Sequence, residues 1–593
     1  MVIIDKLNIE IFDVEVFKED WIITFKNVKS GQYTVIHNDN YALKEFMSQK
    51  DLVVGGFNNK HYDNWIVQAI MLGADNEIVK KLNDFIIGGG NGWNFPFLRY
   101  KRREFEAFDL RDDLPFNLSL KAIEGNLGLD IVESEISFDI DRKLTESELK
   151  STIEYNKVDV DSTVRLFELR EDYLKGKMTV ARIKGFSEVE ALGLTNAKLT
   201  AKYLDAKKVK RNDERDYVIP DTLKKERIPK EVFDFFAQMN DESISDKDLF
   251  KSKLKLEVEG MDYVYGFGGV HGARTNYFST GDKLIVNWDV TSLYPNLMIK
   301  YGYVSRNVPD PSIFKDVVDR RVKAKADGDW EVSDALKLVI NTAYGAMLNQ
   351  WNDLYDPKHA RSVCITGQLL LSDLAFGLAD VCDTFEAINF NTDGIMFAID
   401  MTELPKAYEV KEEWEQRTML ELEEDLIHSV YQKDVNNYII EKTDGSITTK
   451  GGYVSNYDKK EKDLIVNNSM SILDKAIVDY FVHGVPAEQT IQECQDVLQF
   501  QNIAKTGHTY THTIHEVDGR SVKVQKVNRV YATMDEKYGT IYKVKENGRQ
   551  DKIANTPLNA IVDNGNEISI NQIDKQWYID LAEKRINDYK GEK

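Results

Sequence analysis

The sequence predicts a multidomain protein of mixed α/β and α+β class, and three observations indicate it. The chain has 593 residues, more than one hydrophobic core usually serves, so several domains are expected. Stretches that alternate between apolar and polar residues, as strands do, occur beside long patterns with helical periodicity. Apolar runs also end in Asp-Gly or Gly-Gly pairs, which favour tight turns.

Composition sets few limits on function. The net charge of -22 is unusual for a protein that binds nucleic acid, yet a local basic channel can still hold phosphates. Three cysteines cannot form a disulfide framework, which favours a reducing, cytoplasmic location. No apolar run approaches the length of a membrane span, and the amino terminus lacks a secretory signal pattern.

The amino-terminal third carries acidic residues in strand and turn contexts. "LNIEIFDVEVF" alternates like a strand, which turns Asp13 and Glu15 to one face. Asp63 follows a Gly-Gly break in "GGFNNKHYDNW". Solvated carboxylates on a strand and a turn would give the same pattern, so each signal alone is weak.

A long helix is predicted farther along this third of the chain. Thr145 and Glu148 form a capping box at its start. Tyr155 and Asp159 are then i, i+4 neighbours on one face of the helix. Carboxylates in such a set could hold hard divalent cations, because a pair of ions about 3.5–4 Å apart needs several oxygen ligands.

The middle of the chain is less informative. The basic runs "AKKVKRNDER" and "DTLKKERIPKE" are interpreted as solvated faces, with no chemistry assigned. "YGFGGVHGARTNYF" contains Gly268 and Gly269, whose clustering marks a turn or a close approach of the backbone.

Three segments in the carboxyl-terminal half could form a catalytic site. "KLIVNWDVTSLYP" predicts a buried strand with Asp289 at its end, and "INFNTDGIMF" predicts a hairpin with Asp393 at its tip. Between them, "EVSDALKLVINTAYGAM" predicts a helix with Lys337, Asn341 and Tyr344 on one stripe. A turn aspartate and an ordinary amphipathic helix are the plainer interpretations.

In this order the segments resemble known motifs. Asp-x-Glu, Asn-x-x-Tyr-Asp and Tyr-x-x-x-Asp are similar to the DEDD-type 3′–5′ exonuclease. Asp-x-x-Ser-Leu-Tyr-Pro, Lys-x-x-x-Asn-x-x-Tyr-Gly and the Thr-Asp hairpin resemble motifs A, B and C of family B DNA polymerases. The resemblance implies an RNase H-like exonuclease domain followed by a right-hand polymerase. The implied domains are the exonuclease (1–170), a helical connection (171–260), palm (261–312), fingers (313–347), palm (348–464) and thumb (465–593).

The resemblance also implies roles for individual residues. Two Mg²⁺ ions per active site, or Mn²⁺ in their place, would be held by Asp289 and Asp393 in the polymerase and by Asp13, Glu15, Asp63 and Asp159 in the exonuclease, where Tyr155 would orient the water. The nucleoside triphosphate would contact Tyr294, Lys337, Asn341, Tyr344 and either Arg321 or Lys325. DNA would contact Asn59, Gly268, Gly269, Lys450 and Tyr453.

One departure from the family pattern stands out. Where the family has Asp-Thr-Asp-Ser, this chain has Asn391-Thr392-Asp393-Gly394. The aspartate shared with motif A is retained, so we expect Asn391 to leave activity intact. Three histidines at 508, 512 and 515 are interpreted as solvated or DNA-facing residues rather than zinc ligands.

The expected protein is a monomeric DNA polymerase that uses primer–template DNA and deoxynucleotides, with replisome proteins as possible partners and no membrane. Motif A, B and C follow at intervals of about 50 residues, without the insertions of protein-primed members, which favours a nucleic-acid primer. The exonuclease strand begins near residue 1, and so small an enzyme resembles bacteriophage polymerases, active in the host cytoplasm. Two alternatives stay open: an exonuclease with a degenerate polymerase site, and a non-catalytic DNA-binding component of a replisome.

Overall fold

The computed structural model describes residues 7–101, 103–258, 260–279 and 281–592, so the first six residues of the predicted domain 1–170 lie outside it. The chain divides into two compact units. Unit 1 contains the described residues up to Asn196, with Lys459–Met470 and Gln495–Trp577. Unit 2 contains Ala197–Asp458, Ser471–Cys494 and the residues from Tyr578 onward. The prediction of several domains of mixed class is confirmed at this level.

The last part of the chain differs from the expected plan. Residues 465–593, assigned from the sequence to one domain, are shared between the two units. The helices of this part, α17 (Ser471–His483) and α18 (Ala487–Glu493), belong to unit 2, whereas its strands belong to unit 1. Sequence patterns predict elements, but long-range packing decides which core each element joins.

Unit 1 begins with a five-stranded sheet in the order β3-β2-β1-β4-β5. Strand β1 pairs antiparallel with β2 and parallel with β4, and β4 pairs parallel with β5. The strands are β1 (Asn8–Val16), β2 (Trp21–Asn27), β3 (Tyr33–His37), β4 (Leu52–Gly56) and β5 (Glu106–Asp109). The predicted amino-terminal strand is therefore confirmed, and it lies at the centre of the sheet.

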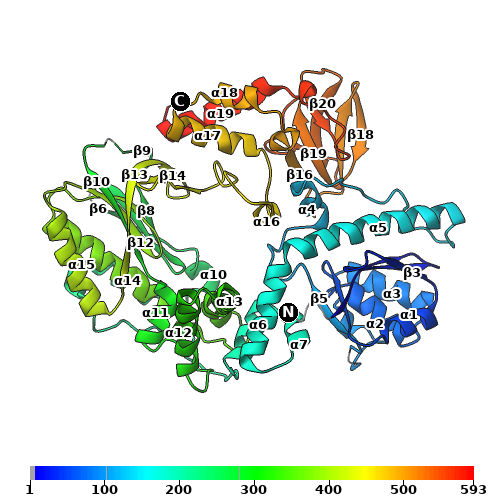
Figure 1. Cartoon of the computed structure of the whole chain (residues 1–593), viewed down its shortest axis with the longest axis horizontal. Helices are drawn as coiled ribbons and strands as arrows, with labels where there is room; N and C mark the ends of the chain where they lie inside the picture. Colours follow the sequence, from blue (N-terminus) through cyan, green and yellow to red (C-terminus); the bar gives the residue numbers. More distant parts are fainter. Residues whose placement is uncertain (1–6, 102, 259, 280, 593) are drawn as a thin grey trace. The chain divides into compact units, whose positions relative to one another are not determined.

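Helices cover this sheet. They are α1 (Asn40–Met47), α2 (Asp63–Met71), α3 (Asn76–Ile87), α4 (Leu120–Asn126), α5 (Glu146–Leu169), α6 (Glu171–Lys184) and α7 (Glu188–Leu192). The long helix α5 packs against β1 and β2 (Figure 1). It starts with the predicted capping box, in which Thr145 and Glu148 satisfy each other's backbone N–H groups.

The later segments of unit 1 form two small sheets. One has the order β16-β19-β22 and the other β18-β17-β20-β21. The strands are β16 (Asn502–Lys505), β17 (His512–Val517), β18 (Arg520–Val524), β19 (Val527–Ala532), β20 (Tyr538–Val544), β21 (Gln550–Lys552) and β22 (Ala560–Val562), and the short helix α16 (Glu461–Leu464) precedes them. Ile503 and Val527 share a core with β1 residues, which ties these strands to the first sheet.

Unit 2 is built on a larger sheet whose central strands carry the predicted catalytic aspartates. Its order is β15-β14-β13-β10-β12-β11-β8-β7-β6, and β9 pairs with β13. The strands are β6 (Leu254–Val258), β7 (Met261–Gly266), β8 (Gly269–Ala273), β9 (Tyr277–Phe278), β10 (Leu284–Val290), β11 (Glu386–Phe390), β12 (Gly394–Ile399), β13 (Leu422–Asp434), β14 (Asn437–Lys442) and β15 (Ile447–Lys450). Strand β10 lies between β12 and β13 and is antiparallel to both.

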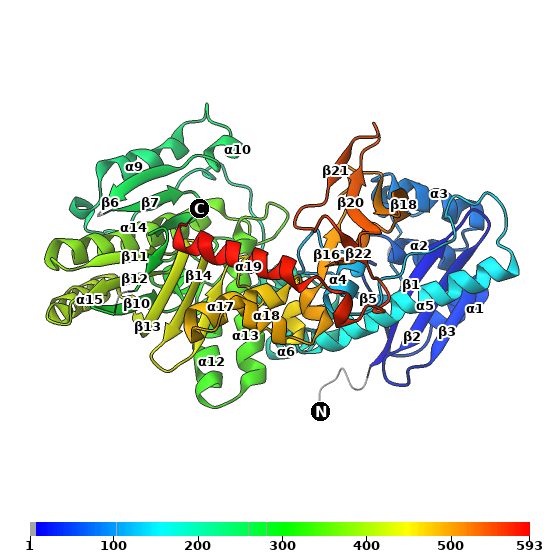
Figure 2. The ribbon, with the colours of Figure 1, turned by 90° about the horizontal axis from the view of Figure 1, so that it is seen from above.

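The helices of unit 2 include the predicted helical pair. Helices α12 (Ser312–Ala326) and α13 (Trp330–Met347) pack against each other across an Asp-Gly turn and form a projecting hairpin (Figure 2). The others are α8 (Asn196–Tyr203), α9 (Lys230–Ala237), α10 (Asp246–Leu249), α11 (Leu293–Lys300), α14 (Pro357–Val381), α15 (Leu404–Thr418) and α19 (Lys575–Lys590), of which α8 and α19 each continue across the boundary between the units.

Helix α14 is the core helix of unit 2. It packs against β8 and β12 of the sheet and against α11, α13 and α15. By length and composition alone it could cross a membrane, so the expectation that no apolar run reaches that length is wrong here. In the structure 94% of its most apolar window is buried, as in the core helix of a globular protein.

Candidate active sites

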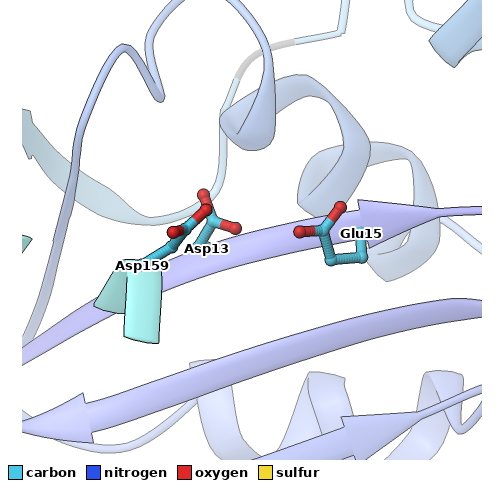
Figure 3. Close-up of side chains that lie close together, drawn as sticks. All are labelled: Asp13, Glu15 and Asp159. Carbon is cyan, nitrogen blue, oxygen red and sulfur yellow. The ribbon is translucent and has the colours of Figure 1, made fainter. Parts of the chain in front are cut away.

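Four acidic residues from three elements of unit 1 gather beside the centre of its first sheet. Asp13 and Glu15 rise from the same side of β1, and Asp159 approaches them from α5 (Figure 3). Carboxylate oxygens of these three residues all lie within 4.8 Å of one another. Asp63, the first residue of α2, lies alongside, where its Oδ1 accepts a hydrogen bond of 3.2 Å from the Val14 backbone N–H.

Glu15, Asp63 and Asp159 are buried and Asp13 is half-buried, and the four carboxylates repel one another. Burial raises the pKa of Asp13 and of Glu15 well above the ordinary range, and the charges of Asp63 and Asp159 raise both further. Burial likewise raises the pKa of Asp63 to about 7 and raises that of Asp159. A set of crowded carboxylates is costly without cations, so the cluster has the character of a metal site.

Two neighbours of the cluster carry no signal in the sequence. Lys121 on α4 makes ion pairs with Asp159 and Glu124, so an ammonium group neutralises part of the cluster. Asn156 on α5 donates a 2.6 Å hydrogen bond to Asp13 Oδ2. Both come from helices far along the chain from β1, which is why no local pattern marks them.

Tyr155 and Asn59, also predicted for the exonuclease, differ in their contacts: one lies beside the acidic cluster and the other is buried in a loop. Tyr155 lies on α5 next to Asp159; burial raises its pKa, and the Asp159 charge raises it further. Asn59 has no exposed surface, and its Nδ2 donates to the Phe108 carbonyl at 2.9 Å and to Asn64 Oδ1 at 3.2 Å. These hydrogen bonds stabilise the loop before α2. A contact of Asn59 with DNA stays a prediction.

The second candidate site lies where β10 and β12 pair in unit 2. Asp289 is opposite Gly394 in the register, so Asp393 is at the adjacent tip of the β11–β12 hairpin. The Val290 N–H donates to the Asp393 carbonyl at 2.8 Å. The structure thus brings together two aspartates separated by more than 100 residues, as the resemblance implied.

Asp289 lies in an acidic environment with one amide partner. Burial raises its pKa to about 6; a hydrogen bond from Asn287 opposes this shift, and the charges of Asp393 and Asp425 add to it. Asn287 Nδ2 donates to Asp289 Oδ2 at 2.6 Å from the same face of β10. Asp425 on β13 is a third carboxylate, ion-paired with Lys442 at 2.6 Å. Sequence reasoning missed Asp425, because only the pairing of β10 with β13 brings it here.

The Asn391-Thr392-Asp393-Gly394 turn fits closely against the motif A strand. A Cβ atom on Gly394 would lie 1.9 Å from Asp289 Oδ1 and 2.8 Å from the Trp288 carbonyl. Gly269, the first residue of β8 after the β7–β8 turn, has a φ of +153°, and a Cβ there would lie 3.2 Å from Thr392 Oγ1. The predicted Gly-Gly loop is therefore a hairpin turn beside the Asp393 tip.

The residues predicted to bind the nucleotide come from three helices. The rings of Tyr294 on α11 and Tyr344 on α13 lie 4.5 Å apart, which places these two residues together. Lys337 and Asn341 are exposed on α13, as the stripe pattern predicted. On α12, Lys325 is exposed, whereas Arg321 is half-buried.

The remaining predicted DNA contacts lie on or after β15. Lys450 packs over the Tyr438 ring at 5.6 Å. The Tyr453 hydroxyl donates to Asp588 Oδ2 at 2.9 Å, so this side chain is engaged by α19.

The histidines of the last strands differ in exposure. His508 is exposed and His512 half-buried, whereas His515 is 3% exposed and its Nε2 lies 2.7 Å from the Ala560 carbonyl. The interpretation of His515 as solvated or DNA-facing is therefore wrong: it is a core residue.

Comparisons with known proteins add little. No family model matches the sequence, and no curated protein matches it either. Among solved structures the chain is similar to a family B DNA polymerase from the hyperthermophilic archaeon Pyrobaculum calidifontis, with 14% identity over 98% of this chain and 78% of that chain and a TM-score of 0.39. A similarity of that degree carries no functional argument, so the proposals below rest on the residues themselves.

Proposed function

We propose that this protein is a template-directed DNA polymerase with a 3′–5′ exonuclease. The observation that carries the proposal is that Asp289, on β10, lies beside Asp393 at the tip of the β11–β12 hairpin. The adjacent rings of Tyr294 and Tyr344, from α11 and α13, support it. The carboxylate cluster of unit 1 supports the second activity. The resemblance of the motifs supplies the reaction class for each site.

Both acidic sites fit hard divalent cations. Their donors are carboxylate oxygens, which Mg²⁺ and Mn²⁺ prefer. Burial raises the pKa of Asp13, Glu15 and Asp289, and repulsion between neighbouring carboxylates raises it further. Asp289 and Asp393 would hold the ions of the polymerase, and Asp13, Glu15, Asp63 and Asp159 those of the exonuclease. When bound, such ions would neutralise phosphate charge and lower the pKa of the attacking hydroxyl or water.

In the polymerase reaction the primer 3′-hydroxyl oxygen bonds to the α-phosphorus of the deoxynucleotide and pyrophosphate leaves. Lys337, exposed on α13, would bind the triphosphate, and Asn341 one turn later would line the new base pair. Tyr294 would lie under the sugar and exclude a 2′-hydroxyl. Tyr344, whose ring lies 4.5 Å from that of Tyr294, would line the new base pair together with Asn341.

In the exonuclease reaction the oxygen of a water would bond to the phosphorus of the last phosphodiester. The bond from that phosphorus to the 3′-oxygen of the preceding nucleotide would break, which releases a nucleoside 5′-monophosphate and leaves a new 3′-hydroxyl. Tyr155 would orient that water as a hydrogen-bond donor, because its raised pKa keeps the phenol protonated. Lys121 would compensate charge on Asp159.

The finer parts of the proposal have their own support. The sheet order β3-β2-β1-β4-β5, with β1 at the centre, supports an RNase H-like exonuclease. The α12–α13 hairpin supports a fingers element, and the sheet around β10 supports a palm. From the resemblance of the motifs we further propose that the protein comes from a bacteriophage and acts as a monomer in the host cytoplasm.

One experiment tests both activities. Primer extension and 3′ trimming are measured with Mg²⁺ on the wild type, Asp289→Ala and Asp13→Ala. We expect Asp289→Ala to lose at least 10²-fold in extension and to keep trimming, because one ligand of only one site is removed. Asp13→Ala should show the reverse.

Other outcomes identify the alternatives. Trimming without extension in the wild type would favour an exonuclease with a degenerate polymerase site. DNA binding with neither reaction would favour a non-catalytic replisome component.

A further inference from the structure

A basic segment that the proposed function does not use crosses one face of unit 2. Residues 207–216, here called the basic strap, follow α8 and include the run "KKVKR". The strap is held in place: the Lys207 and Val209 N–H groups donate to the backbone carbonyl and side-chain oxygen of Asn307, at 2.9 and 3.3 Å. Asn307 is 3% exposed and donates in turn to the Asp353 and Tyr355 carbonyls.

The strap forms one wall of a cavity of about 370 Å³. The opposite wall comes from Gln350, Tyr355 and the start of α14. Lys208 spans the two walls, donating to the Gln350 carbonyl and lying 4.9 Å from the Tyr355 ring. The Asp356 N–H donates to the Met347 carbonyl at 2.9 Å, so the cavity adjoins the end of α13.

The cavity keeps uncompensated positive charge. Three carboxylates line it, against four basic side chains: Asp213 and Asp356 both pair with Arg306, at 2.6 Å each, and Glu214 accepts a 3.1 Å hydrogen bond from the Tyr355 hydroxyl. By contrast Lys208, Lys210 and Arg211 have no carboxylate partner within the described parts of the chain, and Lys208 and Arg211 bond only to backbone and amide oxygens.

Two further features favour an anion here. The cavity includes Asp356 and Pro357, where the 25-residue helix α14 begins, so the positive end of its dipole faces the same space. Arg361, 9% exposed on α14, has two nitrogens, Nε and Nη1, with no hydrogen-bond partner among the described residues. Its strongest charge interaction is with Asp246, outside the cavity lining, and weaker ones are with Tyr355 and Glu214 of the cavity wall.

A large exposed aromatic residue follows the cavity wall directly in sequence. Trp351 directly follows the wall residue Gln350 and is 85% exposed, in a loop held by a 3.0 Å hydrogen bond from its N–H to Asn349 Oδ1. An exposed tryptophan beside a basic groove is the combination with which proteins bind single-stranded nucleic acid, since phosphates follow the groove and a base stacks on the ring.

We infer that the basic strap, the start of α14 and Trp351 form a binding site for single-stranded DNA. The inference rests on the proposed function, which it deepens: the strand would be the uncopied template. Asn341 and Tyr344, proposed to line the new base pair, lie within the last two turns of α13, and the cavity wall begins three residues after that helix ends. Template nucleotides beyond the new pair would reach this cavity next.

The test measures binding with fluorescence anisotropy on the full chain, in EDTA so that no strand is cleaved. The probes are a fluorescein-labelled oligodeoxythymidine of about 20 nucleotides, a length that exceeds one binding site, and a blunt duplex. Trp351→Ala should bind the single strand about tenfold more weakly, the effect of one stacked base. Trp93→Ala, which removes a tryptophan 61% exposed in unit 1, is the matched control and should bind as the wild type does.

A charge series gives a second readout. Lys208→Ala/Lys210→Ala should reduce the slope of log affinity against log salt by about 1.4, or 0.7 for each phosphate contact. Lys225→Ala/Lys230→Ala removes the same charge from exposed positions of unit 2 and should leave that slope unchanged. The Trp351 and strap variants should also lose preference for a primer–template with a long template overhang over a blunt duplex.

The result that overturns the inference is single-strand binding equal to wild type in the Trp351 and strap variants. Inorganic tripolyphosphate is a further probe, added as a competitor of the labelled strand. Strap variants that bind tripolyphosphate more weakly but bind the oligonucleotide as the wild type does would overturn the inference as well, since the cavity would then hold a free polyphosphate. If the wild type binds the single strand as expected but extends no primer, the proposed polymerase function fails and this binding site stands.

Discussion

Gly394 begins β12 directly against the carboxylate of Asp289. Because a Cβ atom would lie 1.9 Å from Asp289 Oδ1, even alanine at 394 must push that side chain away. Gly394→Ala should therefore raise the Mg²⁺ concentration for half-maximal primer extension several-fold and spare 3′ trimming. Gly507→Ala is a control with no atom within 4 Å of the added Cβ. An unchanged Mg²⁺ dependence would contradict this account.

The neighbouring residues Asn391 and Asp393 make a second comparison at the residue scale. Asp393 faces Asp289, whereas the Asn391 N–H closes the turn by donating to the Gly394 carbonyl at 2.9 Å. Asp393→Asn should abolish nucleotide addition, by 10²-fold or more, because it removes a charged ligand. Asn391→Asp should remain active in the same primer-extension assay, and the reverse ranking would refute the assignment of motif C.

At the scale of elements, α6 contains a buried lysine whose charge costs stability. Lys177 is 1% exposed, its Nζ donates to the Leu192 carbonyl at 3.0 Å, and burial lowers its pKa to about 8. Between pH 8 and 10.5 the unfolded chain then binds more protons than the folded one, so this group makes the free energy of unfolding rise with pH.

Lys177→Met tests this contribution. Between pH 7 and 10.5 the free energy of unfolding of the wild type should rise by on the order of 3 kcal/mol more than that of the variant, since one pKa unit corresponds to about 1.4 kcal/mol. Chemical denaturation of both proteins across this range measures the difference. Parallel pH profiles of the two would show that the ammonium group is solvated.

At the scale of the whole molecule, each compact unit contains its own acidic cluster. On the proposed function Mg²⁺ would bind the ionised carboxylates of the folded state, so it should raise the thermal unfolding midpoint, and EDTA should reverse the effect. The gain should be larger at pH 8 than at pH 6, because Asp63 with a pKa of about 7 and Asp289 with one of about 6 hold protons at the lower pH.

Variants separate the two contributions. Asp13→Asn should lose part of the Mg²⁺ stabilisation, and Asp289→Asn another part, as differential scanning calorimetry would record. A midpoint that Mg²⁺ leaves unchanged in the wild type would argue against metal binding at both clusters.

The sequence by itself determined the local elements and the positions of the acidic residues. The alternation around Asp13, the Thr145 capping box and the Asp-Gly hairpin each depend on neighbours within a few residues, so patterns in the chain suffice to predict them. Only the tertiary structure decided the surroundings of those residues. Contacts between distant segments place Lys121 and Asp425 beside the acidic residues. Such contacts also bury Asn59 and His515. Sheet order and core packing set such contacts, and no local pattern encodes which segment will lie opposite another.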